Sequence, residues 1–449
     1  MNTDPVASRL ATRHRVAVVG GGWAGMAAAV ELASAGAQVT VYEAAKTLGG
    51  RARRVEVDGT TLDNGLHILS GAYLETLRLI ETVRRPGEPL GLARMPLTLN
   101  IEPGLRLHAP RLPSPLHLAV ALIGARGLDA AEKLAALRFI GAQRRTGFRC
   151  DSALTVRALL SLHRQPQRLI DLLWAPLCVA ALNTAPDEAS AQVFLTVLRD
   201  GLIASRAASD LLFPTMDFSA LFPERAQRFV EARGGTVRTG ETVRDLRRAG
   251  NGWRIGEDAA ASFSHAILAV GPHRLDRALK DVPELAEARA CADALAYRPI
   301  YSVYLRYPRQ VRLPGPMIGL IGGLGHWAFD RGRLLGQAGL IGVVISGAGP
   351  HESLDNDALA ARIHDELAAR WALPAPLWRR VIAEKRATFA CTPAARRPGN
   401  RTPLSTIFLA GDYTESEYPA TLEAAVRSGV RAAKLILDDI RRQQLPAFS

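Results

Sequence analysis

The hydrophobic pattern of the first forty residues predicts a strand, a tight turn and a helix in immediate succession. Residues 15–19 (RVAVV) are apolar and rich in β-branched valine, as in a buried strand. Three glycines at 20–22 end this run, and an alanine-rich segment typical of a helix continues to Leu32. A second apolar strand over 38–42 ends at Glu43. Strand and helix in this alternation indicate a βαβ unit.

The alternation stops after residue 85 and returns near residue 214. Seven prolines between positions 86 and 115 interrupt any regular alternation of strand and helix. Helices are predicted there over 116–126, 130–145 and 155–163, followed by a nearly uncharged apolar segment over 171–184. Such a helical insert suits a lid or wall for an apolar ligand.

The second half of the chain repeats this division. The pattern predicts the following elements: a helix from 222 to 233, strands over 236–243, 263–272, 300–307, 340–346 and 406–413, and helices over 356–372 and 421–438. We therefore expect an α/β fold with two discontinuous domains. The first takes residues 12–85, 214–285 and 400–440, and the second takes 86–213 and 286–399, including the helical insert.

Composition and charge narrow the class of protein. At 449 residues with 48% hydrophobic and 22% charged residues, the chain is globular. The net charge of +13 comes almost entirely from scattered arginine, without the basic and aromatic interleaving of a nucleic-acid groove. This excess reflects either genomic composition or attraction to an anionic membrane surface.

Cysteine usage and hydropathy bear on the compartment. The four cysteines are far apart and form no metal or disulfide signature, which suits a reducing cytoplasm. Residues 1–15 lack the apolar core of a signal peptide, and no apolar run approaches eighteen residues. We expect a cytoplasmic protein, soluble or peripheral on the inner face of the cell membrane, without a metal site.

The first turn carries a phosphate-binding pattern. Gly20, Gly22 and Gly25 fit G-x-G-x-x-G between a strand and a helix, which is the context that the motif requires. The backbone N–H groups of Trp23 and Ala24 open the helix and face an anion together with the helix dipole. Glu43 follows Gly25 by eighteen residues, where a carboxylate can accept ribose hydroxyl groups.

A second glycine pair and the far end of the chain complete a family resemblance. Gly49-Gly50-Arg51 follows the acidic residue, and a strand near the C-terminus ends in Gly411-Asp412. This arrangement resembles the amine oxidase and phytoene desaturase superfamily of flavoproteins. The resemblance implies a Rossmann-like, two-dinucleotide-binding (GR2-type) FAD domain and an α+β substrate domain.

The resemblance also implies further contacts with FAD. Asp412 meets the ribityl chain, and the helix beginning at Thr421 and Leu422 points its amides at the flavin. A backbone amide of Val243 reaches the adenine, and Gly271 lies at the end of the strand over 263–272. The segment that passes the flavin ring is Asn64, Gly65, Leu66 and His67.

Several segments are more narrowly similar to bacterial hydroxysqualene dehydroxylases. They are 174–178, 180–184, 208–212, 327–331 and 384–390. Three positions depart from the usual patterns: Leu66 and His326 replace glutamine, and Ala424 replaces glycine. The likeness covers residues 15–437 and implies an enzyme of squalene and hopanoid biosynthesis.

The implied reaction is the reductive removal of an allylic hydroxyl group from hydroxysqualene by reduced flavin, giving squalene and water. It requires a proton donor, a hydride donor and a dry pocket. His67, Tyr418 and Glu423 are the candidate proton donors, although a structural role for His67 stays open. The implied partners are a long apolar isoprenoid, a membrane surface and an electron donor that the sequence does not identify.

Three other functions stay open. A carotenoid desaturase or isomerase would use the same fold with the flavin in the opposite redox direction. A flavin amine oxidase would need an aromatic cage, and the aromatic content of 6% argues against one. A non-enzymatic scaffold similar to Rab escort proteins would need a partner-binding surface.

Overall fold

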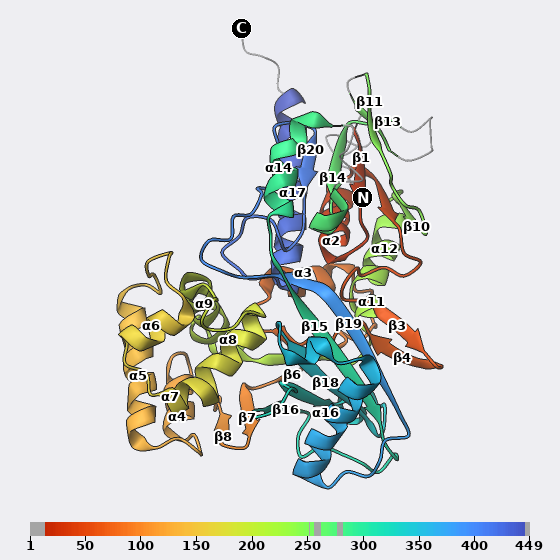
Figure 1. Ribbon diagram of the computed structural model, residues 1–449. Coiled ribbons are helices and arrows are strands. Elements are labelled where there is room, and N and C mark those ends of the chain that lie inside the picture. The colour runs from red at the N-terminus through yellow and green to blue at the C-terminus, as the bar shows by residue number, and fades with distance from the viewer. Residues whose placement is uncertain (1–13, 251, 256–261, 276–281, 445–449) are drawn as a thin grey trace.

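The computed structural model describes residues 14–250, 252–255, 262–275 and 282–444 (Figure 1). A five-stranded parallel sheet has the order β10-β2-β1-β14-β20. Its strands are β1 (Arg15–Val19), β2 (Gln38–Glu43), β10 (Thr236–Thr239), β14 (His265–Leu268) and β20 (Ile407–Leu409). The predicted α/β fold is confirmed, and its strands come from all three segments assigned to the first domain. The domain bounds themselves stay a prediction.

Helices α2 (Trp23–Ser34), α12 (Pro223–Glu231) and α17 (Leu422–Gln444) pack beside this sheet, together with α3 (Leu74–Val83) (Figure 1). Helices α2 and α17 cross closely because α17 has glycine at the crossing. A Cβ atom on Gly429 would lie 2.0 Å from the Ala24 carbonyl oxygen. The two ends of the chain are therefore packed against each other around one sheet.

A seven-stranded sheet forms the other half of the molecule, with the order β19-β15-β18-β17-β16-β7-β8. Its strands are β7 (Thr98–Glu102), β8 (Leu105–His108), β15 (Tyr297–Arg306), β16 (Met317–Leu320), β17 (Trp327–Asp330), β18 (Leu340–Ser346) and β19 (Trp378–Phe389). Helix α16 (Asn356–Trp371) covers one face, where Val303, Ala328 and Val343 are buried. The other face packs in one apolar cluster with the helical insert.

The helical insert lies beside β7 and β8 (Figure 1). Its elements are α4 (Leu116–Ile123), α5 (Ala130–Arg145), α6 (Val156–Leu162), α7 (Gln167–Leu169), α8 (Ala175–Leu182), α9 (Ala191–Leu198) and α10 (Arg206–Ser209). Two π-helical turns, η1 (Ile170–Trp174) and η2 (Arg199–Ile203), continue α7 and α9. Asp129 and Glu132 form a reciprocal capping box at the start of α5.

Shorter elements connect these parts of the chain. They are β3 (Arg54–Val57), β4 (Thr60–Asp63), β5 (Leu69–Ser70), β6 (Leu92–Met95), β9 (Leu211–Pro214), α11 (Phe218–Leu221), β11 (Leu246–Ala249), β12 (Gly252–Ile255), β13 (Ser262–Phe263), η3 (Pro272–Arg274), η4 (Pro283–Leu285), α14 (Ala286–Asp293), α15 (Arg331–Leu335) and η5 (Pro350–Ser353).

The proline-rich segment contains three successive strands, β6, β7 and β8, with no helix between them in the described residues 92–108. The predicted interruption of the alternation of strand and helix is therefore seen here. Pro96, Pro103 and Pro110 lie between or just after these strands. They mark the turns and remove no donor from a strand interior.

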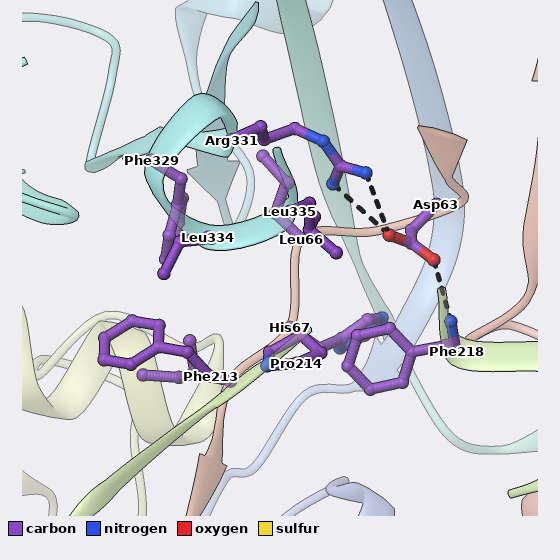
Figure 2. Close-up of a pocket in the computed structure, with 11 residues that line it drawn as sticks. Asp63, Leu66, His67, Phe213, Pro214, Phe218, Phe329, Arg331, Leu334 and Leu335 are labelled. Carbon is purple, nitrogen blue, oxygen red and sulfur yellow. Dashed lines mark hydrogen bonds and ion pairs between the residues drawn. The ribbon is translucent and has the colours of Figure 1, made fainter. Parts of the chain in front are cut away.

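A buried ion pair joins the two halves. The Arg331 guanidinium donates to the Asp63 carboxylate at 3.2 and 3.3 Å, and both side chains are at most 4% exposed (Figure 2). The backbone N–H of Phe218 donates to the other carboxylate oxygen at 3.0 Å. The hydroxyl group of Tyr304 on β15 donates to the Asp63 carbonyl at 2.7 Å. Asp63 therefore holds the large sheet against the hairpin of β3 and β4.

We predict that Arg331→Met destabilises the protein by about 3–5 kcal/mol, because it leaves the Asp63 carboxylate buried without its cation. Urea unfolding followed by circular dichroism measures this loss. The control is Arg380→Met, which breaks a pair with Asp58 whose side chains are 48% and 71% exposed. That change should stay within about 0.5 kcal/mol. Equal effects of the two variants would contradict this role for Arg331.

Candidate active site

At the first glycine turn, the backbones of the strand, the turn and the helix lie so close together that there is no space for side chains. Gly20 has φ +110°, and a Cβ atom there would lie 2.5 Å from the Ala269 carbonyl oxygen. A Cβ atom on Gly25 would lie 1.9 Å from the Gly20 carbonyl oxygen. Helix α2 begins at Trp23, so its first N–H groups have no acceptor within the helix. The turn therefore presents backbone donors of the kind that bind a diphosphate.

The second glycine pair lies directly on the first turn. Gly49 forms a parallel bridge with Gly22, and its N–H donates to the Gly21 carbonyl at 3.0 Å. A Cβ atom on Gly50, which has φ +61°, would lie 3.2 Å from the Gly22 Cα. The two loops thus pack backbone against backbone.

Trp23 contributes its backbone to this site. Its indole N–H donates to the Ala52 carbonyl at 3.1 Å, and its ring packs on Phe218 and Phe222. The side chain is therefore part of the support beneath the turn. Only the N–H groups of Trp23 and Ala24 remain for the predicted contact with a phosphate.

Glu43 lies at the carboxyl end of β2, beside the glycine turn. Its carboxylate accepts the N–H of Gly21 at 2.6 Å and the N–H of Ala45 at 2.8 Å. The loop after β10 runs alongside, because the N–H of Glu241 donates to the Glu43 carbonyl at 3.0 Å. Val243 follows two residues later. The structure therefore brings the expected ribose-binding and adenine-binding residues to one edge of the sheet.

The two chain ends meet through Arg51 and Asp412. The Arg51 guanidinium donates to the Asp412 carboxylate and to the Ala387 carbonyl, each at 2.5 Å. Burial alone would lower the pKa of Arg51, but the Asp412 carboxylate outweighs it and raises the pKa. Gly411 precedes Asp412 with φ +154°, and its N–H donates to Ser428 on α17 at 3.0 Å. Gly271, which follows β14, precedes the turn η3.

The start of α17 and the segment 64–67 complete the expected set. The Thr421 hydroxyl group accepts the N–H of Ala424 at 3.1 Å, so Thr421 caps the helix that begins at Leu422. The Asn64 amide donates to the Arg51 carbonyl at 3.1 Å. Leu66, one of the departures from the family pattern, reaches the sheet, because a Cβ atom on Gly342 would lie 2.5 Å from its side chain.

His67 borders a small cavity of about 20 Å³ (Figure 2). Its ring packs edge-on against Phe218 at 5.2 Å, and its buried Nε2 has no hydrogen-bond partner among the described residues. Burial, with a smaller contribution from Arg51, lowers the pKa of His67 to about 4. The imidazole is therefore neutral at pH 7, with a free polar atom in an apolar setting.

Glu423 has contacts that argue against the predicted role as proton donor. Its carboxylate accepts the N–H of Thr76 at 2.9 Å and the Thr76 hydroxyl group at 2.7 Å. It also accepts hydrogen bonds from the N–H of Glu75 at 3.1 Å and from the Arg427 guanidinium at 2.7 Å. All of these groups are donors, so the Glu423 carboxylate caps α3 and its oxygens are occupied as hydrogen-bond acceptors.

Tyr418 is also engaged elsewhere. Its hydroxyl group donates to the Asp200 carboxylate in η2 at 2.7 Å. Burial and this hydrogen bond raise the pKa of Tyr418 to about 12. Its proton is therefore committed to Asp200, and of the three candidates only His67 keeps a free polar atom.

Besides His67 and Leu66, the cavity is lined by residues that the sequence did not single out as site residues. Those labelled in Figure 2 are mostly apolar, among them Phe213, Phe218, Phe329, Leu334 and Leu335. Asp63 and Arg331 also border the cavity and neutralise each other. The motif 327–331 pointed to this region by its family likeness, without a role for any residue in it.

Residues of this kind fit FAD on structural grounds. Glycine loops approach each other where side chains would block a diphosphate, and carboxylates of Glu43 and Asp412 lie at strand ends. Among the described residues, no cluster of three or more His, Cys, Asp or Glu side chains could hold a metal ion.

Comparisons with known proteins agree with this geometry. The profile described as flavin containing amine oxidoreductase matches residues 23–437, so the chain belongs to that family. FAD is the cofactor of the site.

Within the family, the chain falls among the hydroxysqualene dehydroxylases. It is 32% identical to the hydroxysqualene dehydroxylase of Rhodopseudomonas palustris, over 94% of this chain and 98% of that protein. The 15-cis-phytoene desaturase of Synechococcus elongatus is 26% identical, over 96% and 98%.

Solved structures show the same fold. A putrescine oxidase variant superposes with a TM-score of 0.70 at 18% identity, covering 95% of this chain and 99% of that one. An oxidoreductase from Methanosarcina mazei gives a TM-score of 0.72 at 14% identity, covering 94% and 99%.

We predict that Glu43→Gln weakens FAD binding by roughly tenfold or more, since a charged hydrogen bond contributes about 1.5–3 kcal/mol. Titrating the deflavinated protein with FAD and following flavin fluorescence gives Kd. Glu56→Gln is the control, because Glu56 is 58% exposed on β3. An unchanged Kd for Glu43→Gln, with the control also unchanged, would remove Glu43 from the ribose site.

Proposed function

We propose that this protein is an FAD-dependent oxidoreductase that reductively removes the allylic hydroxyl group of hydroxysqualene to give squalene. The likeness to hydroxysqualene dehydroxylases over nearly the whole chain carries this proposal. The cavity beside His67 supports it, because apolar side chains and a self-neutralised ion pair line that cavity. Such a site suits an uncharged, oily substrate with one polar group.

The protein's own residues have three tasks in this reaction. When bound, fully reduced FAD would supply a hydride to the allylic carbon and a proton to the departing hydroxyl group, which leaves as water. His67 holds the substrate hydroxyl group through its Nε2. No other group among the described residues forms a hydrogen bond with that atom. The rings of Phe213, Phe218 and Phe329 line the cavity and exclude water, and a π-face turned toward the allylic carbon would stabilise positive charge developing there.

A carotenoid desaturase is the second candidate, because phytoene desaturases also match almost the whole chain. Its substrate is a hydrocarbon without a hydroxyl group, and the free Nε2 of His67 would then have no polar partner. Incubation with phytoene under oxidising conditions distinguishes the two functions.

We also propose peripheral contact with a membrane. Leu116, Val120 and Ile123 lie on one face of α4 and are 56%, 43% and 61% exposed. The neighbouring arginines Arg111 and Arg126 are also exposed, a combination that favours an anionic lipid surface. Among the described residues, no helix is long and apolar enough to cross a bilayer.

The first test uses the purified enzyme with FAD photoreduced in the absence of oxygen. Adding hydroxysqualene should reoxidise the flavin and form squalene in equal amounts, measured by absorbance and by gas chromatography. We expect His67→Ala to slow this reaction by roughly 5–150-fold, for a lost hydrogen bond of about 1–3 kcal/mol. FAD content should not change.

The matched control is His108→Ala, because His108 is exposed on β8. Flavin that stays reduced in the wild-type enzyme would overturn the proposed function. Unchanged turnover of His67→Ala would remove only the role of His67.

The second test is sedimentation with liposomes. The protein should pellet with vesicles of anionic phospholipid, and less so at high salt, because screening weakens the attraction of arginine. Replacing Leu116, Val120 and Ile123 by serine should reduce binding several-fold. Leu377→Ser is the control, since Leu377 is 69% exposed outside the helical insert. No binding at any salt concentration would refute the membrane contact.

A further inference from the structure

A second cavity lies between the helical insert and the edge of the large sheet. Its volume is about 190 Å³, against about 20 Å³ for the cavity beside His67. Apolar side chains from several elements line it, among them Leu99, Leu107, Leu122, Ile140, Trp174 and Ile203. The smaller cavity has space for about one water molecule, so a thirty-carbon chain that reacts there needs further apolar space.

Both π-helical turns of the described chain contribute to this second cavity. Turn η1 supplies Leu173 and Trp174, and turn η2 supplies Leu202 and Ile203. A π turn within an α-helix is rare and occurs frequently at functional sites. Two such turns that meet at one cavity indicate a built site.

An apolar row runs across the sheet from β8 and β7, which line the second cavity, to β17, which lines the cavity beside His67. The register places Leu105 beside Ile101, Ile101 beside Gly319, Gly319 beside Trp327 and Trp327 beside Val344. The next row contains Phe329, which lines the cavity beside His67, paired with Gly342 beneath Leu66. These leucine, isoleucine, valine and aromatic side chains belong to one buried cluster.

Helices α4 and α5 both line the second cavity. Leu118, Ala119 and Leu122 of α4 line the cavity, and the exposed face of the same helix carries Leu116, Val120 and Ile123. Arg144 on α5 is the charged residue among those that line the cavity. The apolar surface of α4 therefore continues into the cavity.

We propose that this cavity binds one arm of the isoprenoid substrate, which enters between α4 and α5 and reaches His67 along the apolar row. This inference rests on the proposed function, because it takes the substrate to be a long hydrocarbon with an internal hydroxyl group. A chain that reacts at an internal carbon has an apolar arm on each side, and the second cavity accommodates one of them.

Filling the cavity tests the proposal. A Cβ atom on Gly141, which lines the cavity, meets no atom within 4 Å, so Gly141→Phe occupies open space without a backbone clash. We expect kcat/KM for hydroxysqualene to fall at least tenfold, with FAD content and melting temperature unchanged. Gly201→Phe is the control, because Gly201 is equally open but does not line the cavity. Ala119→Phe fills the cavity from α4 if Gly141→Phe does not fold.

Fluorescence gives a readout that does not depend on turnover. The fluorescence of Trp174 is obtained as the difference between the wild type and Trp174→Phe. Squalene brominated at its terminal double bond should quench this fluorescence. Gly141→Phe should abolish the quenching. Quenching by brominated phospholipid alone would make the cavity a lipid site and overturn the proposal. Unchanged kcat/KM in both filled variants, or no quenching of Trp174 by brominated squalene, would also overturn it.

The two failures can be told apart. Wild-type enzyme that does not convert hydroxysqualene would refute the proposed function. Brominated squalene would in that case still report whether the cavity takes an isoprenoid chain.

Discussion

The contact of two glycine loops is the constraint on which the rest of the structure depends. Gly49 and Gly50 lie directly against Gly21 and Gly22, and a Cβ atom on Gly50 would lie 3.2 Å from the Gly22 Cα. This contact fixes the backbone position of Arg51, whose side chain binds Asp412, 361 residues later in the chain. The position of His67 follows, because Asn64 bonds to the Arg51 carbonyl. The backbone approach near the N-terminus thus sets the geometry of the cavity.

The large sheet provides the apolar wall of the cavity, which the glycine loops do not supply. Its inner face is apolar, and the Asp63–Arg331 pair anchors it to the FAD-binding part of the chain while cancelling the charge of both residues. A buried ion pair contributes little net stability compared with apolar residues of the same size. Its effect here is positional, because Arg331, Tyr304 and Phe218 all converge on Asp63 and bring the sheet to the cavity wall.

The sequence predicted the parts of the site that depend on local patterns. The turn at Gly20–Gly25, Glu43 at a strand end and Asp412 after a strand were found in this way, because short segments specify them. Strand β19 was not predicted, because its charged residues interrupt the alternation of apolar and polar positions. Charged residues of this kind are typical of an edge strand. The sequence predicts Tyr418 and Glu423 as proton donors and does not reveal the groups that engage them in the structure, because Asp200 and the start of α3 are distant in sequence. The residues that line the cavity were not predicted for the same reason, because Phe213 and Phe329 become neighbours only through the tertiary fold.

A crystal structure of the FAD-loaded protein tests the central claim most directly. The account predicts that the diphosphate lies between the turn at Gly20–Gly22 and the pair Gly49–Gly50, with a ribose at Glu43 and the ribityl chain at Asp412. It also predicts the flavin ring beside His67, facing the apolar wall that contains Phe329. Density for FAD away from these glycine loops, or a flavin ring separated from His67 by intervening side chains, would contradict it.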